Sequence, residues 1–326
     1  MEDMSKWKKD SHFVQMGGTV RKRGLWEEIK KNKFFYLIPI PGIITLVLFS
    51  YLPMAGIYMA FENYSYDGGL FGSEFVGLRN FQIFFDNIKY VMRATRNTVI
   101  INLGGIFLGT ILKVSVAVML GEIRNERYRK ATQTIMIFPN FLSWIVVGVI
   151  SDTILNDKSG IINQCIRSLG GEGIGWSLNA WYWWPILIIA GLWKSFGYGS
   201  IIYYATLTGF DPGLYEAAEI DGAGRWQKIT HITVPLLKPT IAILLLLDIG
   251  GILGGSLEQI MGMTKMNPLI LESTDTIATY IYRTTTGAGQ FGIASAVSLY
   301  QSVFGFVMVL GANLLAKKID PDYALF

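Results

Sequence analysis

The sequence is poor in the residues on which soluble proteins and most enzymes depend. Only 16% of its 326 residues are charged, against roughly 25% in an ordinary soluble domain. Its one cysteine, Cys165, excludes an intramolecular disulfide framework and a cysteine-rich metal site. Its two histidines, His12 and His231, are too few for a zinc-protease helix or a histidine proton relay. These shortages argue against a soluble globular protein and against a metal site.

Motifs for nucleotide hydrolysis and for acyl transfer are also missing. No G-x-x-x-x-G-K-[ST] loop occurs, so the chain cannot hydrolyse ATP through that motif. No G-x-S-x-G elbow is present to carry a nucleophilic serine. We therefore expect the chain not to be an enzyme, and we expect it to hold no cofactor or metal of its own.

Long apolar runs dominate what is there. Hydrophobic residues make up 51% of the chain, and the mean hydropathy is +0.39. A bilayer core of ~30 Å needs ~20 apolar residues in a helix, and six runs reach about that length. They are residues 34–61, 98–121, 131–151, 181–210, 239–257 and 284–316. Because these runs lack the regular polar face of a soluble helix, the sequence predicts an all-α polytopic membrane protein with six transmembrane helices.

The basic residues give the expected topology. With the N-terminus inside, the cytoplasmic segments hold eighteen Lys and Arg and the outer segments hold eight, and basic residues are retained on the cytoplasmic side. Both termini are therefore predicted to be cytoplasmic. The expected parts are a basic leader (1–33), a transmembrane domain (34–316) and a short tail (317–326). The leader could be read as an arm for nucleic acid, but its interspersed acidic residues favour a solvated tail, so we expect no nucleic-acid partner.

The segment between the fourth and fifth runs, residues 211–239, predicts a short helix, a turn and a second helix. Asp211 is a good N-cap, and Pro212 at the first helical position loses no hydrogen bond. Gly222 permits the turn, and the second helix is expected to end at Pro235 and Pro239. The alanine-rich face of the first helix is shallow enough to lie against another protein. A plain connector is the alternative reading.

The residues of this segment resemble a known motif. They match the "EAA" loop of permease subunits of bacterial binding-protein-dependent ABC importers of the maltose and glycerol-phosphate type. The matching residues are Glu216-Ala217-Ala218, Asp221-Gly222-Ala223, Ile232 and Pro235. Further stretches resemble the polysaccharide or oligosaccharide branch of this family. They are Tyr51-Leu52-Pro53, Gly77-Leu78-Arg79-Asn80-Phe81, Asp275-Thr276 and Thr279-Tyr280-Ile281-Tyr282-Arg283.

The resemblance implies a type I ABC importer permease bundle in a bacterial cytoplasmic membrane. It implies a second permease subunit, two ATPase subunits that carry ATP and Mg²⁺, and an extracellular solute-binding lipoprotein that delivers a sugar. The ATPase-coupling residues would be Glu216, Ala217, Ala218, Asp221, Gly222 and Ala223. The alternative function is a self-sufficient secondary transporter or channel, and the scarcity of intramembrane carboxylates for ion coupling argues against it.

Four polar residues are candidates for the substrate pathway. Lys194 and Asp248 lie at similar depths, roughly 20 Å and 14 Å from opposite ends of their helices at ~1.5 Å per residue, so we hypothesise that they interact. The alternative is that the lysines in the membrane, Lys113 and Lys194, extend toward the interface and that Asp248 meets a partner chain. Glu258 and Gln259, at the expected outer end of the fifth helix, can hydrogen-bond to sugar hydroxyls. The alternative, which is the simpler reading, is an interfacial polar cap on the helix.

Overall fold

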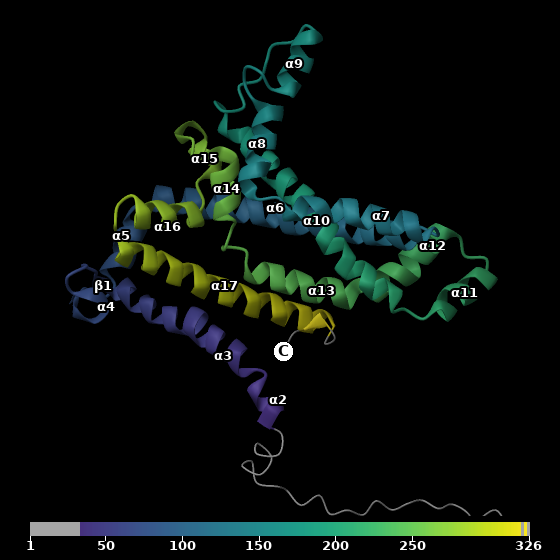
Figure 1. The fold of residues 1–326 in the computed structure, drawn as a ribbon, viewed down its shortest axis with the longest axis horizontal. Coiled ribbons are helices and arrows are strands. Elements are labelled where there is room, and N and C mark those ends of the chain that lie inside the picture. The colour runs from purple at the N-terminus through teal and green to yellow at the C-terminus, as the bar shows by residue number, and fades with distance from the viewer. Residues whose placement is uncertain (1–32, 321–322, 325–326) are drawn as a thin grey trace, which may run out of the picture. The chain divides into compact units, whose positions relative to one another are not determined.

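The structure, a computed structural model, describes residues 33–320 and 323–324 (Figure 1). It divides into two compact units, residues 1–55 and 56–326, which are described separately. The predicted leader, except Lys33, lies outside the described residues, as does part of the predicted tail.

The first unit contains most of the first apolar run. Its elements are α2 (Lys33–Leu37), α3 (Ile40–Leu46) and the π-helical turn η1 (Val47–Tyr51), and the run continues as the 3-10 helix η2 (Leu52–Phe61). Pro39 and Pro41 lack the N–H that a helix interior needs, so α2 ends and α3 begins there. The whole run, Lys33–Phe61, is long and apolar enough to cross a membrane, which confirms the first predicted span.

The second unit contains four more such helices. They are built on α6 (Ile88–Gly121), α10 (Trp183–Thr208), α13 (Val234–Gly250) and α17 (Phe291–Ile319). They confirm the second, fourth, fifth and sixth predicted spans. Many of their large apolar side chains are exposed, including Phe107 at 66% and Phe306 at 65%. Such exposure is expected where lipid or another membrane helix replaces water.

The third apolar run differs from the expected single helix. It forms α7 (Glu126–Ile137), the 3-10 turn η3 (Phe138–Phe141) and α8 (Trp144–Leu155), and the chain bends by 97° between the two parts. Pro139 interrupts the helical hydrogen bonds, and Leu142 is extended. Ser143 then accepts a hydrogen bond from the Val146 N–H and starts α8 as a new helix. The run is therefore a bent pair and not one straight span.

The fifth run begins earlier and ends earlier than expected. A helical run of 26 residues, Arg225–Gly250, joins α12 (Arg225–Lys228), the π-helical turn η5 (Ile229–Thr233) and α13. The prediction that Pro235 and Pro239 end a separate short helix is wrong. Pro235 stands at the start of α13, where a missing N–H is tolerated, and Pro239 lies inside the helix. The run stops at Gly250, seven residues before the expected end, in a glycine-rich segment.

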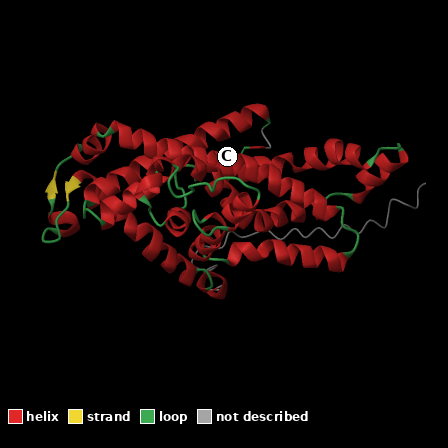
Figure 2. Cartoon of the chain, turned by 90° about the horizontal axis from the view of Figure 1, so that it is seen from above, coloured by secondary structure: helices red, strands yellow, loops and turns green. Residues whose placement is uncertain are grey.

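Short elements connect the long helices of the second unit. They are β1 (Glu62–Asn63), α4 (Gly69–Gly72), β2 (Glu74–Phe75), α5 (Arg79–Asp86), α9 (Ile161–Ser168), η4 (Ala180–Tyr182), α11 (Pro212–Ile220), α14 (Leu257–Thr264), η6 (Pro268–Ile270), α15 (Leu271–Thr274) and α16 (Ile277–Thr286). The two short strands pair antiparallel, with Glu62 opposite Phe75 (Figure 2). Figure 1 shows α11 and α12 near one end of α6 and α10, with α5 and α16 near the other end.

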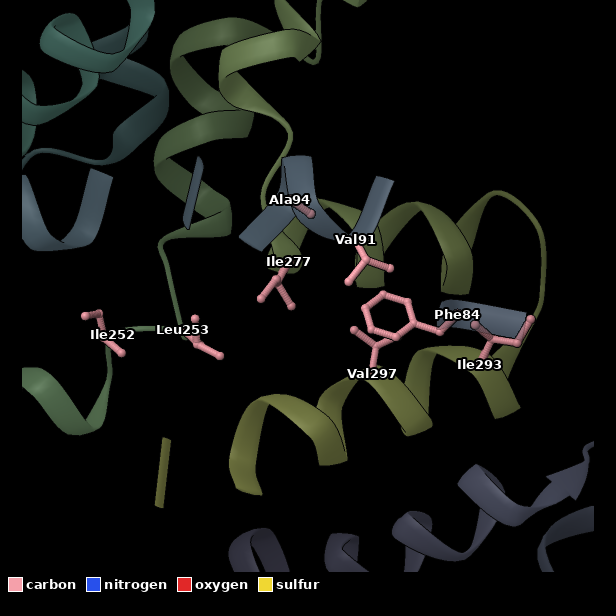
Figure 3. Close-up of a cluster of buried hydrophobic side chains, with 8 residues drawn as sticks. All are labelled: Phe84, Val91, Ala94, Ile252, Leu253, Ile277, Ile293 and Val297. Atoms are coloured by element: carbon pink, nitrogen blue, oxygen red, sulfur yellow. The ribbon is translucent and has the colours of Figure 1, made fainter. Parts of the chain in front are cut away.

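Two kinds of packing hold the second unit together. One is a hydrophobic cluster in which the Phe84 ring of α5 lies between Val91 of α6 and Val297 of α17 (Figure 3). The other is close helix crossing at glycine. A Cβ added at Gly197 of α10 would lie 1.8 Å from the Met136 carbonyl oxygen of α7. Membrane helices approach closely where side chains are smallest, so this position requires glycine.

Candidate functional site

The second unit contains an open cavity of about 410 Å³ among its long helices. Residues of α6, α10 and α13 line it, together with the glycine-rich segment after α13 and the first turn of α14. Its polar lining consists of Asn102, Lys113, Ser195, Asp248, Ser256 and Gln259. This volume falls within the ~300–1,000 Å³ range of small-molecule sites.

Two amide side chains that line the cavity are held by hydrogen bonds to backbone carbonyls. The Asn102 Nδ2 donates to the Ile252 carbonyl at 2.6 Å, and the Gln259 Nε2 donates to the Leu187 carbonyl at 2.7 Å. Because the amide nitrogens are held by the backbone, the amide oxygens remain as acceptors for hydroxyl groups. The Ser256 Oγ accepts from the Gln259 N–H at 3.1 Å and fixes the start of α14. The polar side chains of the cavity lining are thus held in place by the backbone.

The charged groups of the cavity come from α6 and α13. The Lys113 Nζ lies 4.0 Å from the Asp248 Oδ2. The predicted partner of Asp248, Lys194, turns away from the cavity. Its Nζ donates to the Asn140 carbonyl at 2.6 Å and lies 5.6 Å from the centre of the Trp144 ring. The hypothesis of a Lys194–Asp248 pair is therefore wrong, because equal depth says nothing about which side of the helix a residue occupies.

Glu258 and Gln259 are separated by the structure. The prediction put both at the end of the fifth helix, but they begin α14 after a break in the chain. Gln259 is buried and lines the cavity, whereas Glu258 is exposed and does not. Of the four candidates for a substrate pathway, the structure thus brings Asp248 and Gln259 together at one cavity.

The predicted coupling segment forms the expected helix and turn. The Asp211 Oδ1 accepts from the Gly213 N–H at 2.9 Å and caps α11, in which Pro212 is the first residue. Gly222 has φ +79°, a conformation that favours glycine, and it ends α11. Ala217 is exposed and Ala218 is half-buried on the same helix.

Polar contacts hold the segment in place as one piece. The Tyr215 hydroxyl lies 3.1 Å from the Thr233 Oγ1, which ties α11 to η5. Arg225 forms an ion pair with Glu122 beyond the end of α6. The apolar side chains that project from the segment are exposed, with Ile220 at 86% and Trp226 at 75%. The segment therefore presents an apolar surface from a fixed frame, which a plain connector does not require.

The remaining predicted coupling residues belong to the same surface. Glu216, Asp221 and Gly222 are exposed, and Ala223 is half-buried. Among the residues that the structure describes, neither Glu216 nor Asp221 forms an ion pair with another side chain. Their charges are free to meet another molecule.

A buried ionic network at the other end of α6 was missed by reasoning from the residues alone. Asp275, whose side chain is 1% exposed, accepts from Arg93 and from Arg283, each at 2.6 Å. The Asn97 Nδ2 also donates to the Asp275 carbonyl at 2.9 Å. The available signal was the placement of Arg93 and Arg96 one turn apart at the start of an apolar helix, where an acidic partner is needed.

The chain is similar to known transport proteins. The family described as "Binding-protein-dependent transport system inner membrane component" matches residues 105–321. Two relatives from Bacillus subtilis (strain 168) are each 36% identical. They are Protein LplB, aligned over 90% of this chain and 92% of its own, and the polygalacturonan/rhamnogalacturonan transport system permease protein YteP, aligned over 93% of both.

The fold is similar to that of a solved importer. A crystal structure of a bacterial ABC transporter involved in the import of the acidic polysaccharide alginate contains a chain that is 33% identical, with a TM-score of 0.81. The match covers 91% of this chain and 99% of that one. The alginate transporter has also been crystallised in complex with an alginate pentasaccharide-bound periplasmic protein.

Proposed function

The chain belongs to the binding-protein-dependent transport system inner membrane components, and from this premise we propose that it forms the translocation path for an oligosaccharide or polysaccharide fragment. An extracellular binding protein would deliver the sugar. The names of the relatives, which include polygalacturonan/rhamnogalacturonan and alginate transport systems, support this substrate class. Family membership disfavours the alternative of a self-sufficient secondary transporter or channel.

The observation that carries the proposal is the unbroken helical run from the exposed segment to the cavity. Arg225–Gly250 begins beside Gly222 and Ala223 and reaches Asp248 at the cavity wall. The run contains the π-helical turn η5 and Pro239, but it is one continuous helical connection between the segment and the cavity wall. Movement of the segment by an ATPase would therefore reach the groups that face the sugar.

We infer that an ATPase subunit binds at the surface formed by Glu216, Ala217, Ala218, Asp221, Gly222 and Ala223. ATP and Mg²⁺ would be bound by the ATPase subunit and not by this chain. The complete importer would contain a second permease and two ATPase subunits. The excess of Lys and Arg in the segments predicted from the sequence to be cytoplasmic supports a bacterial cytoplasmic membrane protein with both termini and this segment in the cytoplasm.

Two variants of the segment test the function. A leucine at Ala218 would hold an apposed surface away, and a branched residue at Gly222 is strained at φ +79°. We expect Ala218→Leu and Gly222→Val to insert in the membrane but to abolish sugar-stimulated ATP hydrolysis by the assembled importer. The measurement is ATPase activity in proteoliposomes that contain the binding protein, with and without sugar.

The control is Gly311→Ala in α17, where an added Cβ meets nothing within 4 Å. If both segment variants assemble with the ATPase and keep normal stimulation, the coupling assignment is refuted. If the purified chain transports sugar alone in vesicles, the secondary-transporter alternative is correct instead.

A further inference from the structure

The ammonium group of Lys113 is directed toward the middle of its helix. The nearer end of α6 is Gly121, eight residues further on, or about 12 Å at ~1.5 Å per residue. A lysine that avoids the membrane interior extends toward the nearer interface. Lys113 extends the other way, since a Cβ added at Gly109, one turn back, would lie 3.9 Å from its Nζ. The side chain thus places its charge deeper in the membrane than its backbone requires.

A glycine on the neighbouring helix makes room for this path. A Cβ added at Gly199 of α10 would lie 2.6 Å from the Lys113 Cδ and 2.8 Å from its Cε. The lysine chain therefore lies along α10 at Gly199, and a Cβ there would force it to shift. Gly199 thus allows the path by which the Lys113 ammonium reaches the cavity.

The ammonium retains unused hydrogen-bonding capacity at that position. Its Nζ is 4.0 Å from the Asp248 Oδ2, beyond the 2.7–2.9 Å of a charge-assisted hydrogen bond. Within residues 33–320 no hydrogen bond is made by Lys113, although its side chain is only 20% exposed. Lys194 provides the contrast, because its ammonium is bonded at 2.6 Å to a carbonyl outside the cavity.

We propose that Lys113 is the residue that recognises a carboxylate on the transported sugar, and that Asp248 is its counter-ion when no sugar is bound. The proposal rests on the proposed function and names the acidic sugars as its substrate class. A uronate carboxylate in the cavity approaches the ammonium to hydrogen-bonding distance. The Asp248 side chain, 44% exposed, is then hydrated or accepts hydrogen bonds from sugar hydroxyls, as Asn102 and Gln259 do.

Equilibrium binding to the purified importer, without its binding protein, tests this assignment, because the binding protein makes its own selection. The probes are a short oligogalacturonate and the same oligomer with its carboxylates methyl-esterified. Wild type should bind the acid about tenfold or more tightly than the ester, the effect of one charge-assisted hydrogen bond. Lys113→Met should abolish the preference, and Gly199→Ala, which leaves both charges but displaces the lysine chain, should reduce it.

The matched control is Lys194→Met, which removes the other intramembrane lysine and should leave the ratio of the two affinities unchanged. If Lys113→Met fails to assemble because Asp248 is left alone, the double variant Lys113→Met/Asp248→Asn removes both charges and should show the same loss of preference. Equal binding of acid and ester by wild type, binding of neither, or a preference that survives in these variants overturns the proposal. Failure of binding-protein-dependent uptake of any sugar would instead overturn the proposed function.

Discussion

Replacing Asp275 by asparagine should destabilise the second unit far more than a matching change three residues away. The Asp275 carboxylate is buried and binds two guanidinium groups at 2.6 Å. Removing one partner of a buried pair costs about 3–5 kcal/mol, because the other charge is left uncompensated. Arg93 and Arg283 are 23% and 35% exposed, so water compensates in part. We therefore expect the lower figure, about 3 kcal/mol.

Glu272→Gln is the matched control. Glu272 bonds Arg96 at 2.8 Å, but the two side chains are 52% and 40% exposed, and exposed pairs contribute only about 0–1 kcal/mol. The assay is chemical unfolding of the purified importer in mixed micelles, followed by a spectroscopic signal of helix loss. Equal losses for both variants, or a loss below about 1 kcal/mol for Asp275→Asn, would refute the reasoning that burial sets the cost.

Close packing at Gly197, the buried amide of Gln259 and the exposed thiol of Cys165 can each be tested. Gly197→Ala should reduce stability and assembly, because its Cβ would lie 1.8 Å from a carbonyl oxygen of α7. Gly311→Ala, where the added Cβ has open space, should be neutral or stabilising by up to about 1 kcal/mol. Thermal unfolding of the two variants makes the comparison. Gln259→Ala should weaken sugar binding and Glu258→Ala should not, as measured by the half-saturating sugar concentration for uptake. A membrane-impermeant thiol reagent should label exposed Cys165 in intact cells. Labelling only after permeabilisation would show that Cys165 lies on the cytoplasmic side and would refute the proposed topology.

The helices were predictable where local chemistry decides them. The length of the apolar runs was sufficient to predict five spans, because a bilayer core requires ~20 apolar residues in a helix. The Asp211 cap and the Gly222 turn depend only on groups adjacent in the chain. The bend after Pro139 and the tolerance of Pro239 were not predictable. Proline can end, bend or enter a helix, and the tertiary neighbours decide which of these occurs.

The site was harder to predict because it depends on rotation about helix axes as well as on depth. Lys194 and Ser195 are adjacent, yet Ser195 lines the cavity and Lys194 bonds Asn140 on another side of α10. A step of one residue turns a helix by about 100°, so depth in the membrane could not select the partner of Asp248. Long side chains in a helix point toward its N-terminus. This rule was available from the sequence, and it would have predicted that Lys113 extends toward the N-terminal half of α6 and not toward the nearer interface.

The break after α13 gives independent support for the cavity as a polar space. Glycine-rich residues 251–255 are not helical, and the chain there runs between the end of one apolar helix and the start of α14. Irregular backbone at membrane depth is tolerated only where it is buried in protein or faces water, because lipid cannot satisfy its polar groups. Both conditions are met within the segment. Leu253 is 1% exposed in the hydrophobic cluster, while Gly251 and Gly255 line the cavity and the Ile252 carbonyl accepts from Asn102. The glycine-rich segment that ends the helix therefore also forms part of the cavity wall.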